Sequence, residues 1–566
     1  MPTSITSVPT PVNEPVTSYA PGTPERARLE AELARQAATV VEIPCVVGGR
    51  RIFTGNVREV RMPCDHGHVL ARQHLAGPAE VAEAVAAAEA ARGPWAALTW
   101  ESRAAVMLRA AELLSGPWRE RINAATMLGQ AKTAHQADID AACELIDFWR
   151  FNVAYYREML AEQPRAHSPG VWNRTDLRPL DGFVFAIAPF NFTSIAANLC
   201  TAPALMGNTT LWKPSIPSAL ACWLLFELLE AAGLPPGVVN LLGGEGPDIG
   251  PLILARPELG GVHFTGSTAV FQSIWREIGG NIQRYRAYPR IVGETGGKDF
   301  IVAHPSAEVE SLAVAIVRGG FEYQGQKCSA ASRIYVPRSL WPAVSKRCRE
   351  MTLEMKQGDV RDFSNFVGAV IDERAWKRHA QWLERLRAET DVLVGGHASD
   401  RVGWYVEPTW QFTALPWRPR LYFRYASFSG DDTRTPQYEE YRGLFFTIFK
   451  RDWDTWYMGE IAGEFHLFNQ NQKTHMAKLK VFPTATTAIG LWYYSHALDT
   501  PQYFGLPVRE TDWSDEINLG VEYYPDDRLY LFAGTSASRP GPAARQVYGD
   551  DETQWVIETF VSYTFR

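Results

Sequence analysis

The chain has 566 residues, of which 46% are hydrophobic, and a formal net charge of −7. This length exceeds one ordinary hydrophobic core and predicts several domains. The mild acidity, with no block rich in Lys and Arg, argues against nucleic acid as a partner. The seven cysteines are an odd number without CxxC spacing. They indicate neither a disulfide framework nor a usual zinc site, and free thiols fit a reducing compartment.

Residues 1–50 are predicted to form an N-terminal arm. Residues 1–29 are rich in Pro, Thr, Ser and Glu and lack the basic and then apolar segments of a signal peptide. No apolar run reaches the roughly 18 residues that a membrane-spanning helix needs. We therefore expect a cytoplasmic protein.

From about residue 26 to residue 408 the pattern is α/β. Residues 78–91 and 102–114 are rich in Ala, Leu and Glu and have helical periodicity. Short apolar runs that end at Gly, Pro or Asn alternate with the helical segments, namely 183–188, 210–212, 238–242, 261–264 and 300–303. Strands that alternate with helices predict βαβ units and a mainly parallel sheet of the Rossmann type.

Two reactive side chains stand next to glycines. Cys328 follows a turn that contains Gly325 and is flanked by Lys327, which suits a nucleophile if its thiolate is stabilised. The alternative is a buried, inert thiol, the commoner state of a lone cysteine. Glu294 precedes Gly296 and Gly297, so it can be a carboxylate on a loop that substrate approaches closely, or simply part of a solvated turn.

Three further positions can hold an anion. Asn191 follows an apolar strand and can donate its amide to a developing oxyanion, although a turn-forming Asn is the commoner case. Gly266 and Ser267 follow a short strand and open a helix, whose free N–H groups suit pyrophosphate. Lys213 closes the run 210–212 and can reach a ribose or phosphate, or can be a surface lysine.

The order and spacing of these residues resemble the aldehyde dehydrogenase superfamily. The segments that resemble its 1-pyrroline-5-carboxylate dehydrogenase branch are 128–145, 189–193, 294–299 and 321–332, and the resemblance covers about residues 10–409. It implies an NAD-binding domain at 51–292, which includes half of an oligomerisation hairpin, and a catalytic domain at 293–409.

The same resemblance implies a reaction. Cys328 attacks L-glutamate γ-semialdehyde, and Asn191 with the Cys328 N–H holds the oxyanion. Hydride passes to NAD, and Glu294 activates the water that releases glutamate, a step of proline degradation.

The resemblance also assigns binding residues. Lys213, Gly266 and Ser267 hold the cofactor, whereas Phe192, Ser329 and Glu144 shape the pocket of this small-molecule substrate. Many members of the superfamily have an acid at the position of Ile216. The preference for NAD over NADP therefore rests on the branch alone.

Cys64, His66 and His68 are spaced two residues apart. On a strand this spacing puts three side chains on one face. It matches no usual zinc spacing and offers no fourth ligand. We expect no metal site.

The chain departs from the family after residue 409. The family continues with a Glu-x-Phe-Gly-Pro segment, whereas this chain has Trp410-Gln411-Phe412. A glycine-rich substrate loop and the strand that pairs with the hairpin half at 171–179 are missing too. The family is homo-oligomeric, but this pairing strand is absent. We expect a truncated catalytic domain with exposed apolar faces and little or no turnover.

Residues 410–566 have strand periodicity instead of helical periodicity. Ile517, Leu519, Val521 and Tyr523 alternate with other residues, and a second stripe runs from Trp555 to Phe565. Residues 445–449 and 491–494 are rich in aromatic side chains. Strands of about ten residues with one apolar face are typical of a membrane β-barrel, but a soluble antiparallel sandwich has the same alternation.

Five segments of this tail, 423–432, 465–480, 491–505, 512–519 and 555–565, resemble the alginate-export family of outer-membrane porins. This resemblance covers about residues 418–566 and implies a partial antiparallel β-barrel. A membrane is then a partner only if the tail inserts, which the lack of a signal peptide argues against. The alternatives to a dehydrogenase are thus a porin fragment and a non-functional chimera of two genes.

Overall fold

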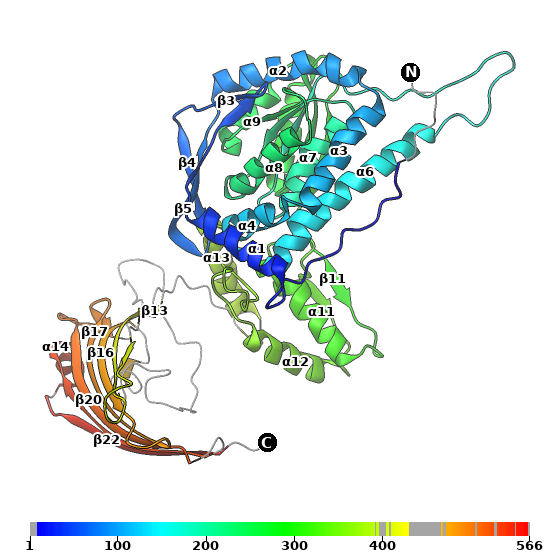
Figure 1. The fold of residues 1–566 in the computed structure, drawn as a ribbon. Helices are drawn as coiled ribbons and strands as arrows, with labels where there is room; N and C mark the ends of the chain where they lie inside the picture. The colour runs from blue at the N-terminus through cyan, green and yellow to red at the C-terminus, as the bar shows by residue number, and fades with distance from the viewer. Residues whose placement is uncertain are drawn as a thin grey trace. The chain divides into compact units, whose positions relative to one another are not determined.

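The computed structural model describes residues 8–390, 392–394, 403–406, 409–428, 466–467, 471–503, 506–525, 529–549 and 551–563. The chain divides into two compact units, residues 1–396 and 397–566. Each unit is described by itself (Figure 1).

A mainly parallel sheet forms the centre of the first unit, as predicted. Its strands in spatial order are β10 (Arg290–Thr295), β9 (Leu259–Gly266), β6 (Phe183–Ile187), β7 (Thr210–Lys213), β8 (Val239–Leu241), β2 (Cys45–Val47) and β3 (Arg50–Ile52). The strands from β10 to β8 are parallel, whereas β2 and β3 are antiparallel to their neighbours. The short apolar runs predicted at 183–188, 210–212, 238–242 and 261–264 therefore mark the strands of one sheet.

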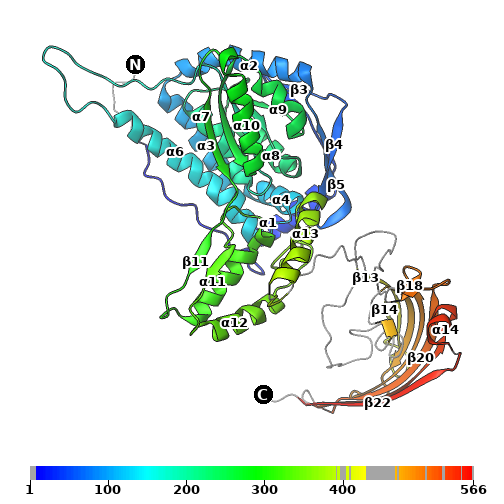
Figure 2. The same cartoon turned by 180° about the vertical axis from the view of Figure 1, so that it is seen from behind.

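Helices cover both faces of this sheet (Figures 1 and 2). One face packs against α2 (Pro78–Ala97), α9 (Gly246–Leu254) and α10 (Thr268–Gly280). On the opposite face α7 (Thr193–Leu205) packs directly on the strands. The core on this side also contains side chains of α1 (Pro24–Ala37), α3 (Trp100–Ser115), α4 (Arg119–Gln130), α6 (Glu144–Ala161) and α8 (Ala219–Ala231). In β6, Phe185 belongs to the first core and Ala186 to the second, because successive side chains of a strand point to opposite faces.

Helix ends follow ordinary capping rules. The hydroxyl of Thr23 accepts from the N–H of Arg26 before α1, and Thr99 caps α3 in the same way. Helix α2 ends six residues later than the predicted 78–91 segment. Trp95 explains the extension, because its ring is buried and its Nε1 donates to the carbonyl of Ala204 at 2.8 Å.

Two smaller groups of elements complete the first unit. A three-stranded sheet consists of β1 (Val41–Ile43), β5 (Asp65–His74) and β4 (Val57–Met62). Between α4 and α6 lie α5 (Ala134–Ala137) and a π-helix, η1 (Asp138–Cys143).

The region after β10 has its own small core. It contains β11 (Phe300–Val302), β12 (Arg333–Tyr335), α11 (Val309–Phe321), α12 (Trp341–Glu354) and α13 (Glu373–Glu389). Leu312 and Val317 of α11 pack against Val344 of α12. Apolar side chains of β11 and β12 are exposed, with Phe300 at 63% and Tyr335 at 53%. Such exposure is what a truncated catalytic domain is expected to show.

The second unit is built on antiparallel strands, as predicted for the tail. One sheet contains β13 (Gly403–Val406), β15 (Arg420–Phe428), β16 (Gln472–Val481), β17 (Thr487–Leu498), β20 (Asp512–Tyr523), β21 (Leu529–Pro540) and β22 (Gln554–Tyr563) in this order, and β14 (Thr409–Gln411) also pairs with β15. The described remainder includes β18 (Gln502–Tyr503), β19 (Leu506–Pro507) and α14 (Pro542–Tyr548). The predicted stripe at 517–523 lies in β20, and the one at 555–565 lies largely in β22. The aromatic segment 445–449 lies outside the described residues.

Within the described residues, no helix is both long enough and apolar enough to cross a bilayer.

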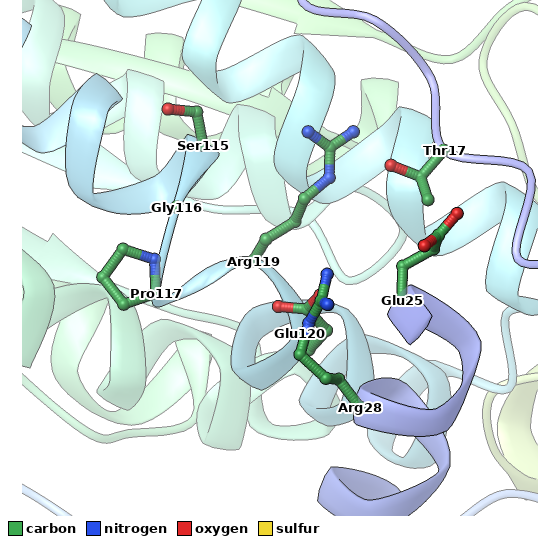
Figure 3. A pocket seen from close by; sticks show the side chains of 8 residues that line it. All are labelled: Thr17, Glu25, Arg28, Ser115, Gly116, Pro117, Arg119 and Glu120. Carbon is green, nitrogen blue, oxygen red and sulfur yellow. The ribbon is translucent and has the colours of Figure 1, made fainter. Parts of the chain in front are cut away.

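The N-terminal arm lies against the helical core through buried charges. Nη1 of Arg119 lies 2.6 Å from Glu14 of the arm, and Nη2 lies 2.8 Å from Asp138 of the π-helix. Arg119 also lines a surface cavity together with Thr17 of the arm (Figure 3). Burial acts to raise the pKa of Asp138, but the hydrogen bonds and charge of Arg119 outweigh it and lower this pKa.

Replacing Arg119 with Met should lower the free energy of unfolding of the first unit by about 3–5 kcal/mol, since it leaves the Asp138 carboxylate buried without a counter-ion. Urea titration followed by helical circular dichroism measures the loss. The exposed pair of Arg28 with Glu120, 2.9 Å apart, supplies the control, because Arg28→Met should cost no more than about 1 kcal/mol.

The folded pKa of Asp138 is depressed. Its contribution is therefore present above the unfolded pKa of a carboxyl group and is lost as the pH falls through the folded pKa. A difference between variants that persisted in strong acid would contradict this account.

Candidate active site

The predicted site residues lie where the parallel strands end. Lys213 closes β7, Gly266 closes β9, Glu294 lies near the end of β10, and Asn191 follows β6 within a few residues. The chain passes from β6 to β7 and β8 on one side, then returns to β9 and β10 on the other. Such a reversal of strand order leaves a crevice at the carboxyl ends of the strands, where open α/β sheets bind ligands.

Cys328 and Glu294 come together at this edge. The Sγ of Cys328 lies 3.4 Å from Oε1 of Glu294. The two loops that carry them approach so closely that a Cβ on Gly297 would lie 1.5 Å from the carbonyl oxygen of Cys328. Only glycine fits at position 297, and this steric limit explains why the Gly296-Gly297 pair follows Glu294.

The surroundings of Cys328 disfavour its thiolate. Burial raises the pKa of Cys328, and the negative charge of Glu294 and its hydrogen bond from the thiol raise it further. The contact with Glu294 disfavours the thiolate of Cys328, but it also places a carboxylate where it can accept the proton of the thiol. Glu294 is exposed, so the same carboxylate is accessible to water.

Asn191 contacts the loop that precedes Cys328. Its Nδ2 donates to the carbonyl oxygen of Gln326 at 2.9 Å. A side-chain amide has two N–H groups, so the second can serve a ligand next to Cys328. The structure thus places Asn191, Glu294 and Cys328 in one site, although their chemical roles stay predictions.

The residues predicted to shape the substrate pocket have different environments. Phe192 is buried, whereas Ser329, next to Cys328, is exposed. Glu144 accepts a hydrogen bond from the hydroxyl of Ser194. Burial raises its pKa to about 7, and the charge of Asp140 adds to the rise.

Sequence reasoning missed a charged cluster behind Phe192. Lys132, Asp140 and Lys327 form ion pairs there, and the Nζ of Lys132 lies 4.2 Å from the centre of the Phe192 ring. Lys132 and Asp140 both fall in segment 128–145, which carries part of the family resemblance, and this was the signal that could have singled them out.

The predicted cofactor residues are suited to an anionic, hydroxyl-bearing ligand. Ser267 caps α10 by accepting from the N–H of Val270, which places Gly266 and Ser267 at a helix N-terminus. Lys213 is buried, burial lowers its pKa to about 8, and its Nζ donates to the carbonyl of Pro214 at 3.2 Å. A buried lysine and a helix N-terminus fit the ribose and pyrophosphate of a dinucleotide.

The part of the chain that the structure describes contains no group of three His, Cys, Asp or Glu side chains placed to hold a metal ion. The Sγ of Cys64 instead lies 3.8 Å from the carbonyl oxygen of Gly358.

Known proteins are similar to most of the first unit. Residues 54–412 match the model of the aldehyde dehydrogenase family. The delta-1-pyrroline-5-carboxylate dehydrogenase of Agaricus bisporus is 45% identical over 412 residues, which cover 72% of this chain and 75% of that protein. The mitochondrial delta-1-pyrroline-5-carboxylate dehydrogenase of Mus musculus is 44% identical over 399 residues, or 70% of this chain and 71% of that protein. The crystal structure of the Delta-pyrroline-5-carboxylate dehydrogenase from Mycobacterium tuberculosis bound with NAD is 54% identical, with a TM-score of 0.68, and the match covers 70% of this chain and 74% of that one.

The Glu294 contact can be tested through the reactivity of Cys328. The thiolate is the form that alkylates, so removing the neighbouring negative charge with Glu294→Gln should lower the pKa of Cys328. The pH midpoint of its alkylation by iodoacetamide, followed by mass spectrometry of the peptide, should then move to lower pH. Glu310→Gln, which changes an exposed carboxylate paired with Arg347, should leave the midpoint in place. An unchanged or higher midpoint in Glu294→Gln would show that the two groups do not interact.

Proposed function

This chain belongs to the aldehyde dehydrogenase family, and from that premise we propose that it is an NAD-dependent dehydrogenase that oxidises L-glutamate γ-semialdehyde to L-glutamate in proline degradation. The similarity to delta-1-pyrroline-5-carboxylate dehydrogenases supports this substrate. The observation that carries the proposal is the 3.4 Å approach of the Cys328 thiol to the Glu294 carboxylate.

The roles of the reacting groups follow from their positions. Cys328 transfers its proton to Glu294, and its sulfur attacks the aldehyde carbon. The oxyanion that forms accepts hydrogen bonds from the Asn191 side chain and the N–H of Cys328. Loss of hydride from the carbon leaves a thioester on Cys328. Glu294, which is exposed, releases the proton it took from Cys328 to solvent. It then removes a proton from water, which attacks the thioester, expels the Cys328 sulfur and releases the glutamate carboxylate.

The cofactor is NAD, which supplies the hydride acceptor when bound. Lys213 is placed to donate to a ribose hydroxyl, and Gly266 with Ser267 presents free backbone N–H groups to the pyrophosphate. In this proposal residues 51–292 form the NAD-binding domain and residues 293–409 the truncated catalytic domain.

Substrate recognition involves the opposite side of the pocket. Phe192 and Ser329 border the aldehyde end of the substrate. Glu144, with a pKa of about 7, can accept a hydrogen bond from the substrate's ammonium group when ionised.

The departure from the family after residue 409 lowers the activity that we expect of this chain. Without the family's Glu-x-Phe-Gly-Pro segment and substrate loop, we expect slow turnover and an altered oligomeric state. The cytoplasmic location stays a prediction, since the mouse relative is named as mitochondrial.

The reaction is tested by NADH formation from L-glutamate γ-semialdehyde. We expect a slow rate that Cys328→Ala reduces by roughly three orders of magnitude, since the nucleophile is lost. Cys348→Ala, in the core of α11 and α12, is the matched control and should retain the rate. Activity that survives Cys328→Ala would disprove the proposed nucleophile. A rate equal to that of a complete relative would disprove the impairment.

A second candidate function concerns the sheet of the second unit. We propose that this sheet is a fragment of an alginate-export-type outer-membrane porin, which makes the chain a chimera. The supporting observation is that the polarity of the two faces is partly inverted, because the exposed face is apolar and the buried face mixes polar side chains with a cluster that contains Trp492, Tyr494 and Phe532. Leu479, Leu491 and Leu519 are paired across β16, β17 and β20 and are 40–48% exposed. Lys478 and Asn518, their neighbours in sequence, are buried on the other face.

This inversion extends across the sheet. Ile517, Val521, Trp555 and Ile557 are exposed, whereas the opposite face buries Thr474, His496, Ser514, Glu516, Glu522 and Ser536. A sheet that is stable in water buries its apolar face instead. Transmembrane strands alternate apolar-out and polar-in, so hydrocarbon is the environment that suits these exposed side chains.

Binding of detergent by the full chain tests the second candidate. The chain should bind dodecyl maltoside micelles, as measured by light scattering coupled to size exclusion. The combined variant Leu479→Lys, Leu491→Lys and Leu519→Lys should weaken this binding, because each Lys costs roughly 2–4 kcal/mol on a lipid-facing surface. The control is Glu373→Lys at an exposed residue of α13, which should leave detergent binding unchanged. A chain that is monodisperse and binds no detergent would rule this candidate out.

A further inference from the structure

Two lysines share one carboxylate oxygen behind the predicted nucleophile. Oδ2 of Asp140 lies 2.6 Å from the Nζ of Lys132 and 3.2 Å from the Nζ of Lys327. Lys132 is 0% exposed and Asp140 is 3% exposed, so neither is accessible to substrate. Any role of Lys132 and Asp140 in the site is therefore exerted through the groups that they bind.

The three side chains come from separate parts of the chain. Lys132 follows α4, Asp140 lies in the π-helix η1, and Lys327 directly precedes Cys328. The π-helix supports two buried acids with different partners. Asp138 bonds Arg119 and the N-terminal arm, whereas Asp140 faces the two lysines. Asp140 therefore links the helical core of the first unit to the Cys328 loop.

This loop adopts an unfavourable backbone conformation. Tyr323, Gln324 and Gly325 are consecutive residues with φ of 52°, 54° and 67°. Residues with a Cβ rarely occupy the left-handed region, and strain of this kind persists only where surrounding contacts impose it.

The contacts that hold this left-handed conformation involve the cluster of Lys132, Asp140 and Lys327. The Nζ of Lys132 lies 4.4 Å from the centre of the buried Tyr323 ring. The Tyr323 hydroxyl has no hydrogen-bond partner in the described part of the chain, so packing and this cation locate the ring. Nε2 of Gln324 donates to the carbonyl of Ala369. Lys327, at the end of the loop, is held by Asp140.

We propose that Lys132 and Asp140 are positioning residues, a buried ion pair that holds loop 323–327 in its left-handed conformation and so places Cys328. Through the loop they also place the Gln326 carbonyl that binds Asn191. The link of this inference to catalysis rests on the proposed function. The effect of the ion pair on loop 323–327 can be measured without turnover.

The test compares Asp140→Asn with Asp138→Asn in the full chain. Both changes remove a buried carboxylate from the same π-helix, so both should lower the thermal transition. Only Asp140→Asn should speed amide hydrogen exchange in peptides spanning 321–329, by about tenfold or more, because it releases a local unit. It should also change the alkylation rate of Cys328, measured on its own peptide. Asp138→Asn should leave both within about twofold of the parent chain.

Asp140→Glu should restore most of the protection in segment 321–329, since a carboxylate is again available to both lysines. If Asp140→Asn does not fold, the double variant Lys132→Met with Asp140→Leu replaces it, because it removes both fully buried charges and leaves only the partly exposed Lys327 without its partner. It should fold and show the same rapid exchange in 321–329.

Two results would overturn the proposal. One is equal loop exchange in Asp140→Asn and Asp138→Asn, which would make the pair merely structural. The other is a folded double variant whose loop stays protected. Failure of the dehydrogenase assay alone would concern the proposed function, because neither exchange nor alkylation depends on NAD or substrate.

Discussion

The close packing of two loops determines the chemistry of the first unit. The backbone at Gly297 lies against the carbonyl of Cys328, at a distance that excludes even one methyl group. This approach puts a thiol and a carboxylate 3.4 Å apart, although 34 residues separate them in sequence. In the proposed mechanism, the two groups can exchange a proton directly at this distance.

The parallel sheet supplies the rest of the site. Because β6, β7, β9 and β10 run in the same direction, residues near their carboxyl ends meet at one edge. The reversal of strand order between β6 and β9 leaves space there for a ligand. Lys213 and the start of α10 lie at this edge, and the buried cluster around Asp140 pairs with Lys327 of the Cys328 loop.

The two units handle apolar surface in opposite ways. The first buries most of its core side chains between helices and sheet, although apolar residues such as Phe300 of β11 and Tyr335 of β12 are exposed. The second exposes a ladder of leucines and buries lysines and acids. Lys480 and Glu522 lie 2.5 Å apart on the buried face and form an ion pair inside the sheet. No one solvent is favourable for the exposed side chains of both units.

The sequence by itself determined the types of strand and helix, the change of pattern near residue 410 and the identity of Cys328, Glu294 and Asn191 as a set. Periodicity and motif spacing are local properties, so they can be read along the chain. Tertiary structure alone decided that Lys132, Asp140 and Lys327 form one buried cluster and that the sheet of the tail buries charged residues such as Lys478 and Glu522. A charged residue in a sequence is by default a surface residue, and its burial and its partner depend on segments that meet only after folding.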